Sequence, residues 1–115
     1  MQSSAMLADV DRGLALDLTA RLVEAGRGRI RTVILYGSRV RGEASAESDF
    51  DLLVVEVDPV SKREEMRRLR EAVNGLPHTA DVWVMGETEF EETRGVIGGL
   101  AYPANKYGIV LYENT

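Results

Sequence analysis

The sequence has 115 residues, of which 44% are hydrophobic, and this length predicts a single domain over residues 1–115. It contains no cysteine, which excludes disulfides and thiolate metal sites, and its net charge of −5 argues against direct nucleic-acid binding. There is no apolar run long enough to span a membrane and no signal-peptide pattern at the first residues. We therefore expect a cytoplasmic protein without a membrane partner.

The first half of the chain predicts one helix and two strands. Apolar residues recur at three- and four-residue steps over residues 7–25, which is typical of a helix with one buried side. Runs of β-branched and apolar residues predict strands over residues 29–36 and 50–57. Gly37 ends the first of these strands.

The second half predicts two helices and two strands. A helix should begin at Ser61, followed by a strand over residues 79–85, a last helix that begins at Thr88, and a short strand over residues 109–112. In both helices a glutamate follows the initial Ser or Thr by three residues, the pattern of a capping box.

The order of these elements predicts a mixed β-sheet with helices packed on it, a fold of the α/β (α+β) class. The strands over residues 50–57 and 79–85 should be parallel, because a helix lies between them in the chain. The strands over residues 29–36 and 50–57 should be antiparallel if Gly37 is to lie beside Asp49.

Acidic residues gather at the beginning of two predicted strands. Asp49 and Asp51 are two residues apart, so their side chains point the same way with about 6.6 Å between Cα atoms. Asp81, at the start of the next parallel strand, should lie beside them. Close carboxylates repel and raise each other's pKa, and Mg²⁺ relieves the repulsion while it binds substrate phosphates. With Gly37 and Ser38 alongside, the pattern outlines a two-metal phosphoryl-transfer site.

Each part of this pattern also has a purely structural interpretation. Two Asp residues separated by one residue more often mark a solvated strand end than a metal site, and Gly-Ser after a strand is usually a turn. Five arginines between Gly26 and Gly42 form either a solvated basic face or a local anion site. Trp83 and Phe90 are predicted to lie in the core, whereas Tyr36 either lines a nucleotide pocket or packs.

The combination is more specific than its parts. Gly37-Ser38 is followed by ten residues, then by Asp49 and Asp51, and a third aspartate begins the next strand. The segment LYGSRVRGEASAESDFDLLV therefore resembles the nucleotidyltransferases of the DNA polymerase β superfamily. The chain is most similar to the minimal nucleotidyltransferases, the MntA-like antitoxins of prokaryotes, and the resemblance extends over residues 29–113.

This resemblance implies a polymerase β-like nucleotidyltransferase fold and a role for each residue of the motif. The residues that it places on the phosphates of ATP are Gly37, Ser38 and, as a brace, Arg39. The residues that it implies for catalysis and for binding two Mg²⁺ ions are Asp49, Asp51 and Asp81. Among these, Asp81 is expected to help an acceptor hydroxyl attack the α-phosphate.

The resemblance also implies a partner. Minimal nucleotidyltransferases often act as antitoxins to a HEPN-domain toxin, and such proteins can transfer AMP from ATP to a tyrosine of the toxin. A non-catalytic subunit that neutralises its partner by docking alone is the alternative. The three aspartates favour the enzyme, because docking does not require them together. A stand-alone enzyme acting on antibiotics or polymers fits less well.

Overall fold

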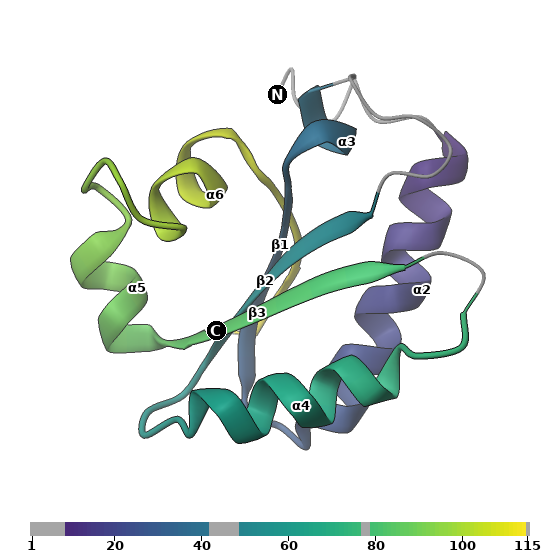
Figure 1. Cartoon of the computed structure of the whole chain (residues 1–115), viewed down its shortest axis with the longest axis horizontal. Helices are drawn as coiled ribbons and strands as arrows, with labels where there is room; N and C mark the ends of the chain where they lie inside the picture. The colour runs from purple at the N-terminus through teal and green to yellow at the C-terminus, as the bar shows by residue number, and fades with distance from the viewer. Residues whose placement is uncertain (1–8, 42–48, 77–78, 115) are drawn as a thin grey trace.

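The computed structural model describes residues 9–41, 49–76 and 79–114 (Figure 1). The predicted start of the first helix at residue 7, and most of the ten residues between Ser38 and Asp49, lie outside these ranges. The helices are α2 (Asp9–Gly26), α3 (Ser38–Arg41), α4 (Lys62–Ala72), α5 (Glu87–Thr93) and α6 (Ala101–Tyr107). The strands are β1 (Ile30–Tyr36), β2 (Phe50–Glu56), β3 (Ala80–Gly86) and β4 (Ile109–Glu113).

The four strands form one mixed sheet in the order β3-β2-β1-β4. β1 pairs with β2 and with β4 in the antiparallel sense, whereas β2 and β3 are parallel. Both predicted strand orientations are confirmed, and so is the α+β class with a mixed sheet. β3 is an edge strand, so one of its sides has no neighbouring strand among the described residues.

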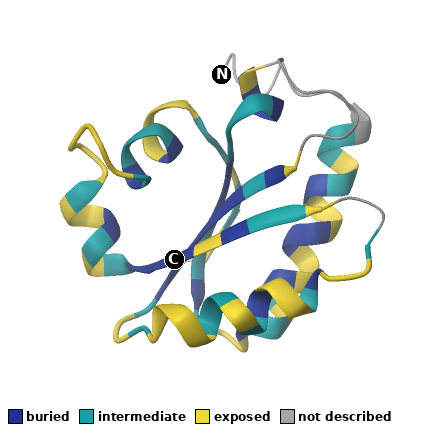
Figure 2. Ribbon diagram, in the orientation of Figure 1, coloured by how far each residue is buried: buried dark blue, intermediate teal, exposed yellow. Residues whose placement is uncertain are grey.

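Helices cover both faces of the sheet (Figure 1), and Figure 2 marks the buried stretches of the strands between them. The alternation of side chains along the strands divides the core in two. On one face, α2 and α4 pack against Phe50, Leu52 and Val54 of β2. On the other face, α5 and α6 pack against Leu53 and Val55 of the same strand. Because β2 lies inside the sheet, both of its faces are apolar over most of its length.

The helices differ from the prediction in two ways. The one-turn helix α3 was not predicted, because four residues are too few to show a helical period. The predicted last helix is two helices, α5 and α6, separated by residues 94–100, where three glycines weaken the helix. Among the described residues no helix is both long and apolar enough to cross a membrane.

Both predicted capping boxes are wrong. Ser61 is the N-cap residue of α4, but its side chain makes no capping hydrogen bond. Thr88 lies inside α5, whose N-cap is Gly86. The carboxylate of Asp58, which is distant in sequence, accepts hydrogen bonds from the Thr88 amide (2.9 Å) and hydroxyl (2.6 Å). A tertiary contact therefore takes the place of the local one at this helix start.

The two aromatic residues that were predicted in the core behave differently. Phe90 is buried between α5 and the sheet, as predicted. Trp83 remains 41% exposed, so its prediction is wrong. Trp83 shares a sheet face with Asp81 and Met85, and the cluster formed by α5 and α6 includes Met85 but not Trp83.

Candidate active site

Three neighbouring strands bring one polar residue each into a single row. In the register of the sheet, Tyr36 of β1 lies opposite Asp51 of β2, and Asp51 lies opposite Asp81 of β3. Asp49 precedes Asp51 by two residues and accepts a short hydrogen bond from the Thr79 hydroxyl. The sheet therefore gathers the predicted carboxylates at one end of its strands, on the face that α5 and α6 partly cover. We call Asp49, Asp51 and Asp81 the acidic row.

The charges in this row disfavour one another. Burial raises the pKa of the Asp51 carboxyl, the nearby charges of Asp81 and Asp49 raise it further, and only Arg41 acts in the opposite direction. Burial, together with Asp51 and Asp81, also raises the pKa of the Tyr36 hydroxyl, so Tyr36 stays neutral. Neighbouring oxygen donors that carry negative charge are what Mg²⁺ prefers, so these residues fit a divalent cation.

The turn after β1 depends on Gly37 for two separate reasons. Its φ of +88° lies in the left-handed region that favours glycine. A Cβ at this position would overlap a carboxylate oxygen of Asp51, so the backbone of the turn lies directly against the acidic row. The Gly37 carbonyl then accepts hydrogen bonds from the amides of Val40 (3.1 Å) and Arg41 (3.2 Å), which begins the turn of α3.

A cavity of about 530 Å³ opens beside this turn, within the size range of small-molecule sites. It is bounded by the end of β1, by α3, by Asp51 and by α6. The residues that line it are Tyr36, Gly37, Ser38, Val40, Arg41, Asp51, Pro103 and Tyr107. Tyr36 thus lines the cavity, one of the two roles that its sequence position allowed. The contribution of Pro103 and Tyr107 was missed, because no sequence pattern links α6 to the Gly-Ser turn.

The structure does not bring Arg39 to this cavity. The Arg39 side chain is buried, pairs with Asp11 at 3.0 Å, and stacks 4.2 Å from the ring centroid of Phe50. Phe50 faces the α2 side of the sheet, opposite to Asp51. Arg41, two residues later, lines the cavity instead. Side chains two residues apart on a helix point in different directions, so a predicted helix here could have suggested Arg41 in place of Arg39. The helix α3 itself was not predicted.

The run of five arginines does not form a common anion site. Arg29 donates to the carbonyls of Val57 and Pro59 at the opposite end of β2. Arg31 pairs with Glu87 at 3.5 Å. Arg41 is the residue of the run that lines the cavity described above.

The Asp81 carboxylate has partners of its own. One oxygen accepts a hydrogen bond from the Trp83 indole at 3.1 Å, and the other lies 3.6 Å from the Arg70 guanidinium. As the side chains lie, no three acidic or histidine residues within the described ranges are close enough to hold a metal ion together. Metal binding by the three aspartates therefore requires a movement of side chains, and the contacts of Asp81 with Trp83 and Arg70 oppose it.

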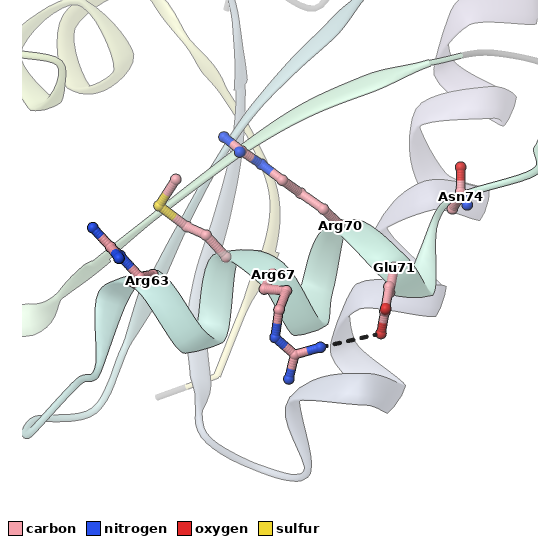
Figure 3. A pocket seen from close by; sticks show the side chains of 6 residues that line it. Arg63, Arg67, Arg70, Glu71 and Asn74 are labelled. Atoms are coloured by element: carbon pink, nitrogen blue, oxygen red, sulfur yellow. Dashed lines mark ion pairs between the residues drawn. The ribbon is translucent and has the colours of Figure 1, made fainter.

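A second and larger hollow, of about 730 Å³, lies along the outer side of α4 (Figure 3). It is lined by Arg63, Met66, Arg67, Arg70, Glu71 and Asn74. In Figure 3, Arg67 points toward Glu71, whereas Arg70 extends toward the sheet. This hollow contains none of the predicted site residues, and Arg70 connects it to Asp81.

The chain belongs to the nucleotidyltransferase domain family, whose model matches residues 20–102. The matched segment includes the Gly-Ser turn and all three aspartates.

The chain is also similar to individual proteins, both in sequence and in structure. One, from Methanocaldococcus jannaschii, bears the name of a putative protein adenylyltransferase and is 55% identical over 29 residues. This match spans 25% of the chain and 29% of that relative. The crystal structure of a putative nucleotidyltransferase from Sulfolobus solfataricus superimposes with a TM-score of 0.63 at 19% identity, over 90% of this chain and 80% of the other. The second similarity supports the fold.

Proposed function

We propose that the chain transfers AMP from Mg-ATP to a hydroxyl, most simply a tyrosine, of a HEPN-type toxin and thereby acts as its antitoxin. One observation carries this proposal: Asp51 and Asp81 lie side by side. They adjoin a glycine turn that lies against Asp51 and a cavity of nucleotide size. The M. jannaschii relative, by its name a protein adenylyltransferase, supports a protein acceptor.

The cavity supplies the nucleotide site in this proposal. Tyr36, Pro103 and Tyr107 offer flat, largely apolar surfaces against which a base can lie. The glycine at position 37 lets the phosphates approach the backbone, and the Ser38 hydroxyl can bond to their oxygens. Arg41, rather than Arg39, is the arginine that we assign to the triphosphate, because it lines the cavity.

Asp49, Asp51 and Asp81 would hold the Mg²⁺ ions. When bound, Mg²⁺ neutralises charge on the triphosphate and polarises the phosphorus that is attacked. Asp81 lies on the edge strand, where the hydroxyl of a partner protein can approach from the side that no described strand occupies. We assign Asp81 to orient this hydroxyl for attack on the α-phosphorus, with pyrophosphate as the leaving group.

Intact-mass measurement of the partner tests the proposal. The chain is mixed with a HEPN-type toxin and Mg-ATP, and this partner should gain the mass of one AMP. The Asp49→Asn/Asp51→Asn double variant is the control and should leave the partner unmodified. Tight binding without any mass increase would contradict the enzyme and favour the docking alternative.

A second measurement tests the metal and the nucleotide separately from the partner. A ligand that binds only the folded state raises the melting temperature by mass action. Mg²⁺ and ATP together should raise the melting temperature of the wild type but not that of the double variant. An equal shift in both proteins would remove Asp49 and Asp51 from the metal site.

A further inference from the structure

Trp83 is the single tryptophan of the chain, and its place on the surface is unusual for so large an apolar side chain. It lies two residues after Asp81 on the edge strand β3, and both side chains point to the same face. Its indole Nε1 donates a hydrogen bond to Oδ2 of Asp81 at 3.1 Å. The exposed ring therefore makes a specific polar contact with a proposed catalytic carboxylate.

Arg70 reaches the same carboxylate from the other side of the sheet. It begins in α4, whose buried residues pack on the face opposite to Asp81 and Trp83. Its Nε donates to the Val82 carbonyl at 2.9 Å, on the open edge of β3. The guanidinium then lies 5.3 Å from the centroid of the Trp83 ring and 3.6 Å from Oδ1 of Asp81. Figure 3 shows the Arg70 side chain extending from α4 to the strand.

These contacts form a closed set of three side chains, which we call the Asp81–Trp83–Arg70 cluster. Each member contacts the other two, and the Val82 carbonyl fixes Arg70 at the strand edge. Both oxygens of the Asp81 carboxylate are engaged. A cation that draws Asp81 toward the other two aspartates therefore competes with the indole N–H and the guanidinium for this carboxylate.

We propose that Trp83 and Arg70 are positioning residues that hold Asp81 in this cluster and so lower the affinity of the acidic row for a divalent cation. When the cation binds, Asp81 loses its contacts with Trp83 and Arg70 and contacts the metal instead. This inference rests on the proposed function in one respect, the role of Asp81 as a metal ligand. It accounts for the exposed tryptophan and for the side chains of the row lying too far apart to share a metal ion.

Mn²⁺ titration without nucleotide tests the inference, with free Mn²⁺ followed by its electron paramagnetic resonance signal. Arg70→Gln and Trp83→Phe should each bind Mn²⁺ about two- to fivefold more tightly than the wild type, the range expected for one exposed charged contact. Trp83→Phe keeps an aromatic ring at this position and removes the N–H donor. Both substitutions lie at partly exposed positions, and circular dichroism verifies the fold of each variant.

Two controls separate a contact with Asp81 from a general charge effect. Arg67→Gln removes the same charge from the same helix, but Arg67 pairs with Glu64 and Glu71. Its Mn²⁺ affinity should change less than that of Arg70→Gln. In an Asp81→Asn background, Arg70→Gln should have no further effect, because the contact is already lost.

The fluorescence of Trp83 gives a second readout, which a purely structural role would not change. Diamagnetic Mg²⁺ should alter the indole emission of the wild type as Asp81 leaves the Nε1 hydrogen bond. The change should be absent in Asp81→Asn. No other tryptophan contributes to the signal.

Two results would overturn the inference in distinguishable ways. If the wild type binds Mn²⁺ and Arg70→Gln binds it equally or more weakly, the cluster does not restrain Asp81, and the proposed function stands. If none of the proteins binds Mn²⁺, the metal site of the proposed function is wrong and the inference is wrong with it.

Discussion

The two ends of β2 each carry a carboxylate whose pKa is raised, but the surroundings of these two carboxylates differ. At the first end, Asp51 opens toward the cavity, and after burial the charges of Asp81 and Asp49 raise its pKa most. At the other end, Glu56 is 0% exposed, and burial together with Glu65 raises its pKa from 4.5 to about 7. One carboxylate faces other acids at the surface, and the other is enclosed.

The surroundings explain the difference. Arg29 lies 3.5 Å from Glu56, and Glu65 in turn pairs with Arg68 at 2.9 Å, so this end of the strand combines a raised pKa with nearby arginines. At the Asp51 end, Arg41 is the single cation that lowers the pKa. Stable folds neutralise buried charge by pairing or by protonation. The acidic row instead keeps a repulsion between carboxylates that an incoming cation can relieve, as the proposed function requires.

The largest expected effect is on AMP transfer, and it distinguishes the two ends of β2. Asp81→Asn should lower AMP transfer to the partner by at least about a hundredfold, the size of one lost electrostatic contact at a reacting centre. Mg-ATP affinity should change only a few-fold, because Asp49 and Asp51 remain. Glu56→Gln makes the same chemical change at the other end and should leave transfer unaltered. Transfer rates and calorimetric titration measure both, and a fully active Asp81→Asn would remove Asp81 from the site.

The next effect concerns the contact between Gly37 and the acidic row. Gly37→Val strains the turn and displaces Asp51, so ATP affinity should fall more than about tenfold. Ser38→Ala removes one hydrogen bond, worth about 1 kcal/mol, and should cost about fivefold. Gly75→Val is the matched control, since Gly75 has a similar φ of +87° and nothing near its missing Cβ. Unaltered nucleotide affinity in Gly37→Val would contradict the assignment of this turn.

A third experiment addresses the enclosed end of β2. Because the pKa of Glu56 is raised on folding, the folded state retains a proton between pH 4.5 and about 7 that the unfolded state loses. The stabilisation is complete below this window and is lost as the pH rises through it. The free energy of unfolding should fall by up to about 3 kcal/mol across the window, and Glu56→Gln should remove this fall. Urea unfolding at several pH values measures it, and an identical pH profile in the variant would contradict it.

The smallest effect concerns repulsion in the acidic row. Asp51→Asn removes one of the repelling charges, so without divalent cations the variant should melt about 2 °C above the wild type. With Mg²⁺ and ATP the order should reverse, because the wild type alone gains stability from binding. Thermal unfolding under both conditions decides this. A variant that is less stable without cations would show that Asp51 supports the fold instead.

The sequence determined most of the architecture because its signals are local or topological. The patterns of β1, β2 and β3 predicted strands close to those observed, and the helix between β2 and β3 predicted their parallel pairing. The placement of Asp81 beside Asp51 follows from that pairing and is confirmed in the register. The spacing from Gly37-Ser38 to the aspartates predicted the family.

Tertiary structure alone decided which neighbours these residues have. Arg39 lies on the α2 side of the sheet and Arg41 at the cavity, because a short helix that no periodicity reveals rotates the two side chains apart. Trp83 stays exposed and contacts Asp81 because α5 and α6 leave this part of an edge strand uncovered. A sequence pattern states which face of a strand a residue occupies, but packing between distant segments determines what covers that face.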